Sequence, residues 1–514
     1  MAALSKDAVV AVLGAGAMGA GIALVAASAG HPVRLYDVAP DAVARALDRL
    51  RTELQGRVAR GRLDPAEAEA RLARIAPAVT VESLSDAMLV VEAVIEDLDA
   101  KADLLGRLQP RLAEEAIVTT NTSSLGVTEL AARLSRPERV AGLHFFNPAA
   151  VMPLVEVVSG AATDPAVADI LFDTAAAWGK VPVRCRSTPG FIVNRIARPF
   201  YGEALRLLNE GAADPATLDA IFRDCGAFRM GPFELMDLIG HDVNFAVTCS
   251  VYQAFFQDPR YRPSLIQKEL VAAGRLGRKS GRGFYVYGDD APAPAPHEAA
   301  AGSRPERIEI MGDLGPAAAL GAMLAEAGLA GPPTAGEGVI HLDGLDLVLT
   351  DGRTATERQA ASGRPTALFD LALDYRATGR IALAFAAGAT SAQRAAACGL
   401  FQALGKHVSP IEDIAGMAVM RTVALLANEA ADAAAEGLAA PGEIDMAMVK
   451  GANYPIGPLA WADRIGAARL TAVVDALART CPDGRYRTAQ RLRRAAITGE
   501  GLGDPAAEPG RGPR

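Results

Sequence analysis

Two hydrophobic patterns divide the first part of the chain. Short apolar runs without helical spacing predict buried strands of a parallel sheet, and they lie at residues 8–13, 88–95, 117–120, 140–146 and 154–158. The charged, alanine- and leucine-rich stretch 41–75 has apolar positions at helical spacing and predicts a helical hairpin. From Ser187 the spacing stays helical, which predicts an all-helical domain with helices at 191–210, 215–225 and 236–256.

The first apolar run ends in a glycine-rich turn. A small-residue helix pattern follows to residue 30, and a second apolar run ends in Asp37. This order predicts a dinucleotide-binding βαβ unit, in which Gly14 makes the turn, Gly16 admits a pyrophosphate and Gly19 lets the helix pack closely. The pyrophosphate is expected over residues Gly14, Gly16, Ala17, Met18 and Gly19. The carboxylate of Asp37 would accept hydrogen bonds from the ribose hydroxyls of NAD and would repel the extra phosphate of NADP.

Residues 8–30 carry no charged side chain, so a membrane span or a signal peptide is an alternative. The clustered glycines and the apolar run that follows almost at once favour the βαβ unit. We therefore expect no membrane association.

Composition narrows the class of protein. A chain of 514 residues, 50% hydrophobic and 22% charged, can form several domains, and a net charge of −8 argues against a nucleic-acid binder. Five cysteines without a CxxC pair indicate reduced thiols in a cytoplasmic protein and no zinc site.

Polar residues follow the predicted strands where ligands bind in such sheets. Glu96 and Lys101 follow one strand and are candidates for the cofactor side, and residues 121–124 follow the next. The second group could equally cap a helix.

A histidine and an acid lie on neighbouring apolar strands. Glu156 inside VEVV is costly unless it is paired, and His144 lies twelve positions earlier. The two could form a general base oriented by a carboxylate, although His144 could also be a hydrogen-bonded core residue.

Several motifs in order resemble the L-3-hydroxyacyl-CoA dehydrogenase family over residues 7–287. They are GAGAMGAGIA with LYD, VEAVIED, NTSSL, GLHFFNP, VEVV, PGFIVNR and GRKSGRGFY. The resemblance implies His144 as general base, Glu156 as its partner, and Ser123 and Asn194 as contacts to the reacting oxygen of the substrate. It also implies that NAD contacts Glu96, Lys101, Asn147 and Lys279.

The implied reaction is NAD-dependent oxidation of a 3-hydroxyacyl-CoA to the 3-oxoacyl-CoA. Arg57, Arg60 and Arg62 cluster near the turn of the helical hairpin, where they could bind phosphates of the acyl-CoA or form a solvated surface. The resemblance implies fatty acid metabolism or phenylacetate catabolism, and the duplicated long form resembles bacterial enzymes of aromatic-acid catabolism. The substrate would then be 3-hydroxyadipyl-CoA, with 3-hydroxybutyryl-CoA as the alternative.

The second half of the chain is predicted to duplicate the first in degenerate form. An Ala-Pro linker precedes a strand and a broken glycine turn, in which Asp313 lies between Gly312 and Gly315 and disfavours a phosphate. Asp219, Asn209-Glu210 and Asp237 recur as Asp445, Asn428-Glu429 and Asp463, and Arg260-Tyr261-Arg262 recurs as Arg485-Tyr486-Arg487. Asp413 falls at the place of Asn194, so no second active site is expected. The second copy would pack on the first, shape the acyl pocket or support a homodimer.

The predicted fold class is α/β plus all-α: an N-terminal doubly wound Rossmann domain, a helical domain, a degenerate α/β domain and a second helical domain. The expected boundaries are 1–186, 187–288, a linker at 289–305, 306–408, 409–498 and a disordered tail at 499–514.

Two other classes share part of the pattern. The 6-phosphogluconate and 3-hydroxyisobutyrate dehydrogenases share the opening motif, but they generally use a lysine base. A non-catalytic NAD-binding scaffold is disfavoured by the intact set of Ser123, His144, Glu156 and Asn194.

Overall fold

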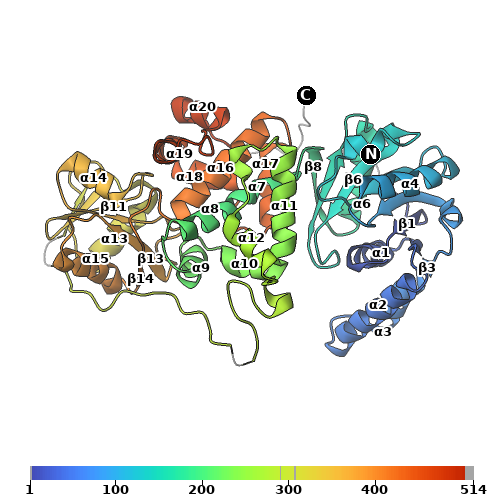
Figure 1. Cartoon of the computed structure of the whole chain (residues 1–514), viewed down its shortest axis with the longest axis horizontal. Helices are drawn as coiled ribbons and strands as arrows, with labels where there is room; N and C mark the ends of the chain where they lie inside the picture. Colours follow the sequence, from blue (N-terminus) through green and yellow to red (C-terminus); the bar gives the residue numbers. More distant parts are fainter. Residues whose placement is uncertain (1–2, 290, 306–307, 504–514) are drawn as a thin grey trace. The chain divides into compact units, whose positions relative to one another are not determined.

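A computed structural model describes residues 3–289, 291–305 and 308–503, and the chain divides into two compact units. Unit 1 comprises Met1–Arg195 together with Glu436–Ala452, and unit 2 comprises Ile196–Ala435 together with Asn453–Arg514. Figure 1 shows the chain coloured from the N-terminus to the C-terminus.

Unit 1 is built on an eight-stranded sheet in the order β3-β2-β1-β4-β5-β6-β7-β8. Its strands are β1 Val9–Leu13, β2 Val33–Tyr36, β3 Ile75–Pro77, β4 Ala87–Glu92, β5 Ile117–Thr120, β6 Val140–Phe145, β7 Leu154–Ser159 and β8 Val181–Arg186. The first six are parallel, and β7 and β8 run antiparallel to them. The sequence pattern predicted β1, β2, β4, β5, β6 and β7 as strands, but not β3, β8 or the reversal at β7.

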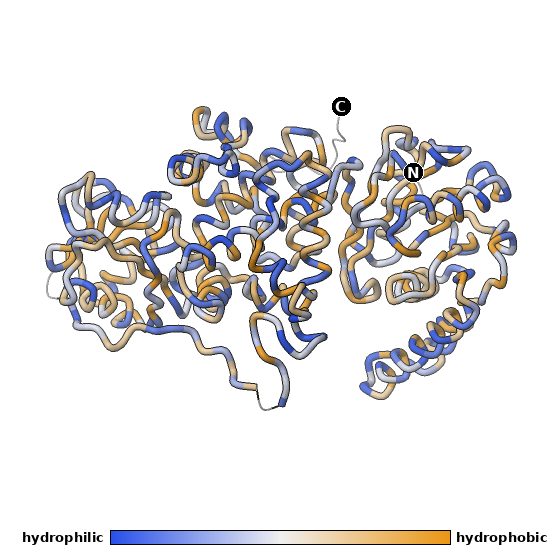
Figure 2. The backbone as a smooth tube through the Cα atoms, viewed as in Figure 1, coloured by the Kyte–Doolittle hydropathy of each residue, from blue (hydrophilic) through white to orange (hydrophobic). Residues whose placement is uncertain are grey.

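Helices cover both faces of this sheet. They are α1 Ala17–Ala29, α2 Ala42–Ala59, α3 Pro65–Ala73, α4 Leu98–Leu108, α5 Val127–Ala131 and α6 Pro165–Ala177. Val10 and Val12 of β1 belong to one core and Ala11 and Leu13 to the other, because neighbouring strand residues point to opposite faces. β1 is accordingly apolar at every position. Figure 2 shows the backbone coloured by the hydropathy of each residue. The doubly wound fold is confirmed.

The uncharged window 8–30 is a strand, a turn and a 13-residue helix. No helix in the described part of the chain is long and apolar enough to cross a membrane. The predicted hairpin is also present, since α2 and α3 form an antiparallel pair that projects from the sheet (Figure 1).

The first helical region contains shorter helices than the pattern predicted. They are α7 Val193–Ile196, α8 Arg198–Asn209, α9 Pro215–Asp224, α10 Pro232–Ile239, α11 His241–Ala254 and α12 Leu265–Ala272. The single helix expected at 191–210 is wrong because Pro199 starts a new helix in its first turn. The helix expected at 236–256 is broken at Gly240, whose φ of 99° suits glycine.

A smaller, mixed sheet follows the linker in unit 2, in the order β14-β13-β12-β11-β10-β9. Its strands are β9 Ile308–Met311, β10 Val339–Leu342, β11 Leu345–Leu349, β12 Thr366–Phe369, β13 Arg380–Phe385 and β14 His407–Pro410, with helices α13 Ala318–Glu326, α14 Ala355–Ser362 and α15 Ser391–Ala403. Asp313 accepts a hydrogen bond from the Gly315 N–H at 2.8 Å, so the broken glycine turn binds its own carboxylate.

The second helical copy contains α16 Val419–Ala435, α17 Pro441–Gly451, α18 Pro458–Ile465, α19 Ala467–Thr480 and α20 Gln490–Thr498. Two junctions give its register against the first copy: Phe191 and Met417 share a positive φ (47° and 55°), as do Gly240 and Gly466 (99° and 95°). The same shift places Met420, not Asp413, at the position of Asn194.

This register also shows that the predicted equivalence of Asn209-Glu210 and Asn428-Glu429 is wrong. Glu203 and Glu429 are the equivalent acids, because each accepts a hydrogen bond from a tyrosine of the other copy. Tyr486 Oη lies 3.1 Å from Glu203 and Tyr261 Oη lies 2.6 Å from Glu429. Seven residues are about two helical turns, so the apolar face looks the same in either register.

The predicted disordered tail begins too early. Asp237 accepts from the N–H groups of Phe284 and Tyr285, and Asp463 accepts likewise from those of Leu502 and Gly503. Leu502 is fully buried. The chain is therefore ordered to Gly503, and residues 504–514 lie outside the described residues.

Candidate active site

His144 and Glu156 are directly opposite each other on the antiparallel strands β6 and β7. Side chains of such a pair point to the same face of a sheet. Nδ1 of His144 lies 2.6 Å from Oε2 of Glu156, and the two residues are 3% and 0% exposed. The strand register thus buries Glu156 and also places it next to His144, its hydrogen-bond partner.

The second oxygen of Glu156 anchors the chain that follows β8. Oε1 accepts hydrogen bonds from the backbone N–H groups of Ile192 and Val193, each at 3.0 Å. These groups begin α7, whose first N–H donors need partners. Asn194 is the next residue, so Glu156 positions both His144 and the backbone that carries Asn194.

Ser123 contacts the other side of the imidazole. Its Oγ lies 3.0 Å from Nε2 of His144. Ser123 belongs to the loop after β5, where the N–H groups of Ser123 and Ser124 donate to Oε1 of Glu96. Burial opposes the ionised form of Glu96, but hydrogen bonds from Thr122 and Ser124 and the charge of Lys101 keep its pKa below the ordinary value.

Hydrogen bonds thus connect Ser123, His144 and Glu156 in a line. Because a carboxylate only accepts hydrogen bonds, Nδ1 carries a proton and Nε2 is free to accept one. The rings of Phe146 and Phe191 lie beside the imidazole, with centroids 4.6 and 5.6 Å away. This arrangement can take a proton at Nε2 and stabilise the imidazolium through Glu156.

The glycine-rich turn fits a pyrophosphate. A Cβ on Gly14 would lie 2.5 Å from the oxygen of Ala93, and one on Gly19 would lie 1.8 Å from that of Gly14, whereas nothing lies within 4 Å of a Cβ on Gly16. The N-terminus of α1 has no side-chain cap and no acid in its first turn. Ala17 is exposed and Met18 is half-buried there. The turn therefore offers open space and free N–H donors to an anion.

Asp37 follows β2 beside this turn. Its carboxylate accepts from the N–H groups of Ala15 (2.7 Å) and Ala39 (2.9 Å). The first bond ties the end of β2 to the glycine-rich turn, which is the place expected for the ribose of a dinucleotide.

The other candidate NAD contacts differ in their surroundings. Lys101 is 1% exposed, and its Nζ lies 2.7 Å from Glu92 and 3.3 Å from Glu96, so it supports the Ser123 loop. Asn147 is exposed just after β6. Lys279 belongs to unit 2, where its Nζ lies 2.5 Å from Asp242.

Arg57 and Arg60 lie where α2 ends, at the turn of the hairpin, and Arg62 follows. Arg57 is half-buried, and Arg60 and Arg62 are exposed. None of the three forms an ion pair with any residue the structure describes.

The sequence gives no sign that a segment of the second half of the chain packs on the sheet of unit 1. Residues 436–452 belong to unit 1, and α17 packs on β7 and β8. Glu443 accepts from the Arg184 N–H at 2.9 Å, and the buried Arg195 pairs with Glu436 at 2.7 Å. These contacts span about 250 residues of chain, and no local pattern signals them.

The second copy contains a carboxylate that binds the start of a helix as Glu156 does, but no equivalent of His144. Asp370 after β12 accepts from the N–H groups of Ala418 (3.0 Å) and Val419 (2.7 Å), as Glu156 does from the start of α7. Its other partners are the N–H groups of Met420 and Leu371.

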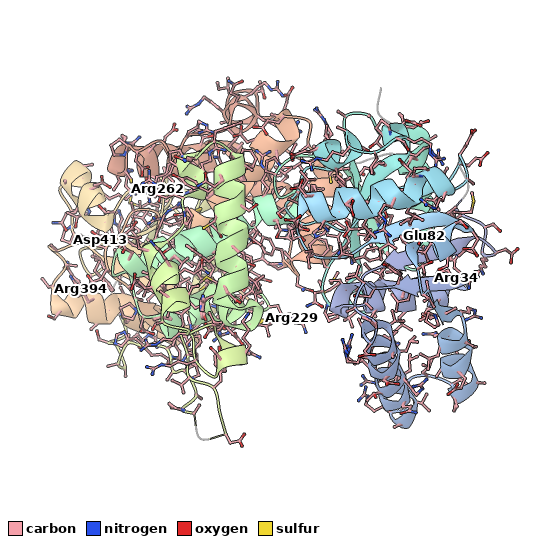
Figure 3. The ribbon with its side chains drawn as sticks, turned by 45° about the vertical axis from the view of Figure 1, so that its right-hand side comes forward. Arg34, Glu82, Arg229, Arg262, Arg394 and Asp413 are labelled. Carbon is pink, nitrogen blue, oxygen red and sulfur yellow. The ribbon has the colours of Figure 1, made fainter. Side chains whose placement is uncertain are left out.

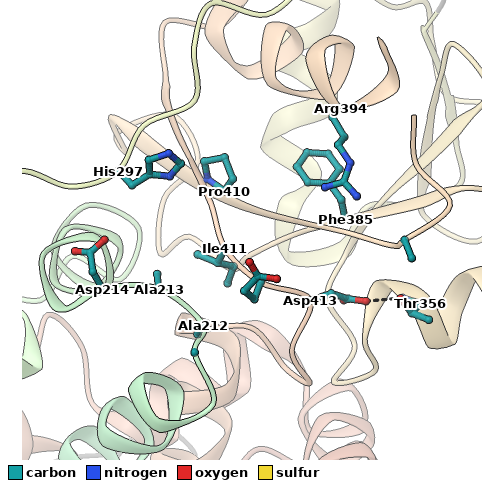
Figure 4. A pocket seen from close by; sticks show the side chains of 13 residues that line it. Ala212, Ala213, Asp214, His297, Thr356, Phe385, Arg394, Pro410, Ile411 and Asp413 are labelled. Carbon is teal, nitrogen blue, oxygen red and sulfur yellow. Dashed lines mark hydrogen bonds between the residues drawn. The ribbon is translucent and has the colours of Figure 1, made fainter. Parts of the chain in front are cut away.

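Asp413 has a different role from the one its sequence position suggested. It accepts from the N–H groups of Ala355 and Thr356 at the start of α14 and lies at the edge of a cavity of about 520 Å³ (Figure 4). It is a helix-capping residue.

Three family models match the chain. The 3-hydroxyacyl-CoA dehydrogenase NAD-binding domain matches residues 9–188, and the C-terminal domain of the same family matches 190–287 and again 416–506. The reduced Rossmann-fold domain of 3-hydroxybutyryl-CoA dehydrogenase matches 347–414. The NAD-binding match confirms the predicted cofactor.

Known proteins resemble the chain over different lengths. A 3-hydroxyadipyl-CoA dehydrogenase of Escherichia coli K12 is 44% identical and covers 96% of this chain and 98% of its own. A crystal structure of 3-hydroxybutyryl-CoA dehydrogenase from E. coli K12 superposes with a TM-score of 0.88 at 43% identity, covering 96% of this chain and 99% of that one. Human mitochondrial hydroxyacyl-coenzyme A dehydrogenase is 39% identical and covers 54% of this chain and 90% of its own. The chain belongs to the 3-hydroxyacyl-CoA dehydrogenase family.

Proposed function

We propose that the chain oxidises the 3-hydroxyl group of a 3-hydroxyacyl-CoA through the line formed by Ser123, His144 and Glu156. The observation that carries this proposal is the pair of contacts at His144, 2.6 Å to Glu156 and 3.0 Å to Ser123. Nε2 of His144 takes the hydroxyl proton, and Glu156 stabilises the imidazolium that forms. NAD, held at the glycine-rich turn that contains Gly14, Gly16 and Gly19, would supply the acceptor for the hydride from C3.

Positioning falls to the neighbouring polar groups. Ser123 and Asn194 hydrogen-bond the reacting oxygen and the thioester, so that the substrate meets Nε2 in one orientation. Gly14, Gly16 and Gly19, with the N–H groups of Ala17 and Met18, receive the pyrophosphate, and Asp37 the ribose. Glu96, Lys101, Asn147 and Lys279 remain proposed cofactor contacts, with Lys101 acting through Glu96.

Arg57 and Arg60 are proposed to bind phosphates of the CoA moiety. Both lie at the hairpin turn without a carboxylate partner among the described residues. An unpaired guanidinium can bind a phosphate through two hydrogen bonds.

The proposed substrate is 3-hydroxyadipyl-CoA, a thioester with a distal carboxylate. A relative of that name matches the chain over nearly its full length, whereas the short relatives match only its first half. The alternative, 3-hydroxybutyryl-CoA, is supported by the similar solved structure.

Absorbance of NADH during turnover tests the proposal. Purified protein should reduce NAD with 3-hydroxyadipyl-CoA, and kcat/KM should fall for 3-hydroxybutyryl-CoA. Failure to reduce NAD with either thioester would refute the activity, and a higher kcat/KM for the shorter one would refute the preferred substrate.

The remaining sequence expectations stay predictions. They are the domain boundaries before the C-terminal tail, a homodimer and a cytoplasmic location. Native mass measurement and fractionation of cells test the last two.

A further inference from the structure

Asn194 lies on a helix of a single turn, α7. A helix of four residues has little stability of its own, so contacts from outside must hold it. The chain enters α7 through Phe191, whose φ of 47° is uncommon for a residue with a side chain. The side chain of Asn194 is half-buried and makes no hydrogen bond with any residue that the structure describes. Its orientation therefore depends on what holds α7.

Contacts from the second half of the chain hold α7 on both sides of Asn194. Nη1 of Arg195 donates to Oε2 of Glu436 at 2.7 Å, and Arg195 is 1% exposed. On the other side, a Cβ on Gly451 would lie 3.0 Å from Cγ2 of Val193, so α17 approaches that side chain closely. All of these residues belong to unit 1.

The two copies exchange this segment symmetrically. α17 of the second copy packs on β7 and β8, and α9 of the first copy packs on β13. The register of the two copies relates β7 to β13 and α17 to α9. The N–H of Arg186 donates to the oxygen of Leu438 at 2.9 Å. The N–H of Glu412 likewise donates to the oxygen of Ala212 at 2.9 Å, one residue before Asp413 (Figure 3).

The exchange also repeats the ion pair. In this register Arg195 and Glu436 correspond to Arg421 and Glu210, which pair at 2.6 Å. The residue before Arg421 is Met420, whereas the residue before Arg195 is an asparagine. The same pair thus lies beside a group that can hydrogen-bond a substrate in one half of the chain, and beside an apolar side chain in the other half.

We propose that Glu436 is a positioning residue of the active site, which holds Arg195 and thereby orients Asn194 toward the substrate. This inference rests on the proposed function, in which Asn194 hydrogen-bonds the reacting oxygen or the thioester. Such a hydrogen bond depends on the distance and angle between donor and acceptor, so a small displacement of α7 weakens it. The second half of the chain then contributes to the active site without supplying a group that touches the substrate.

A double-mutant cycle tests the proposal. It measures kcat/KM for whichever of the two proposed thioesters the wild-type protein oxidises better. Glu436→Ala should lower this kcat/KM about tenfold in the wild-type background. In an Asn194→Ala background the same change should alter it less than about twofold, because the group that Glu436 positions is already absent. The KM for NAD should stay within about twofold, since the glycine-rich turn and Asp37 are unchanged.

Glu210→Ala is the matched control, because it removes the equivalent ion pair beside Met420. It should lower the melting temperature and leave kcat/KM within about twofold of wild type. Folding should not limit the test, since the side chain of Glu436 is 52% exposed. The melting temperature of each variant checks this.

The outcomes separate this inference from the proposed function. A wild-type protein that reduces NAD with neither thioester refutes the proposed function and this inference with it. In an active protein, a Glu436→Ala change without effect, or with an equal effect in both backgrounds, overturns the positioning role and leaves the proposed function intact. An equal loss of kcat/KM in Glu210→Ala overturns it as well, because the loss would then follow from stability alone.

Discussion

Glu156→Gln isolates the charge that orients His144. Glutamine keeps an oxygen for the N–H groups of Ile192 and Val193 but presents an NH2 group to Nδ1, where Oε2 now lies at 2.6 Å. Two donors cannot face each other, so the imidazole must shift its proton to Nε2. Nε2 would then donate to the substrate hydroxyl instead of accepting from it.

The expected cost in turnover is large and the cost in stability is small. A wrong histidine tautomer and a lost counter-charge lower kcat by about 10³ to 10⁴ in a comparable hydrogen-bonded triad, or about 4 to 5.5 kcal/mol. The two backbone N–H groups would donate to a neutral oxygen instead of a charged one, which costs about 1 kcal/mol for each hydrogen bond. The free energy of unfolding should therefore fall by about 2 kcal/mol.

Asp370→Asn is the matched control. Asp370 anchors the start of α16 as Glu156 anchors the start of α7, but it contacts no histidine. Each oxygen of Asp370 accepts hydrogen bonds from two backbone N–H groups, so the NH2 group of asparagine would face two donors, and the denaturation midpoint should fall at least as far as in Glu156→Gln while kcat stays within about twofold. NADH absorbance and urea denaturation measure both effects. A folded Glu156→Gln protein with turnover within tenfold of wild type would refute the orienting role of Glu156.

Three further predictions concern the support of the site. Gly451→Leu should destabilise the protein by about 1 to 3 kcal/mol, because a Cβ at this position would already lie 2.4 Å from Leu154 and 3.0 Å from Val193; an unchanged melting temperature would contradict the contact between α17 and the catalytic sheet. Asp37→Ala should reduce the preference for NAD over NADP, and an unchanged ratio of kcat/KM would remove Asp37 from ribose recognition. Glu96→Gln should raise the KM for NAD at pH 7. The wild-type protein should show this rise only below about pH 4.5, because Glu96 keeps its charged hydrogen bonds above its lowered pKa and loses them below it; the same dependence of KM on pH in the variant and the wild type would contradict this role.

Much of unit 1 follows from local sequence. The glycine turn is predictable because Gly14 and Gly19 leave no room for a side chain and Gly14 has a φ of 104°. The pairing of His144 with Glu156 is predictable because a carboxylate in an apolar strand needs a partner, and the preceding strand carries a histidine.

Other features have no local signature. The contact of α17 with β8 joins residues about 250 positions apart, and Arg184 and Glu443 are ordinary surface types in the sequence. The sequence does not determine the register of the second copy, because a shift of two helical turns preserves the apolar face of the helix.

The most direct test of the catalytic assignment is the turnover of His144→Gln measured together with its affinity for NADH. Removing the base should lower kcat/KM for 3-hydroxyadipyl-CoA by about a thousandfold or more, while the NADH Kd stays within about threefold because the glycine turn and Asp37 are untouched. A variant that binds NADH normally and retains wild-type turnover would contradict the assignment of His144 as the general base.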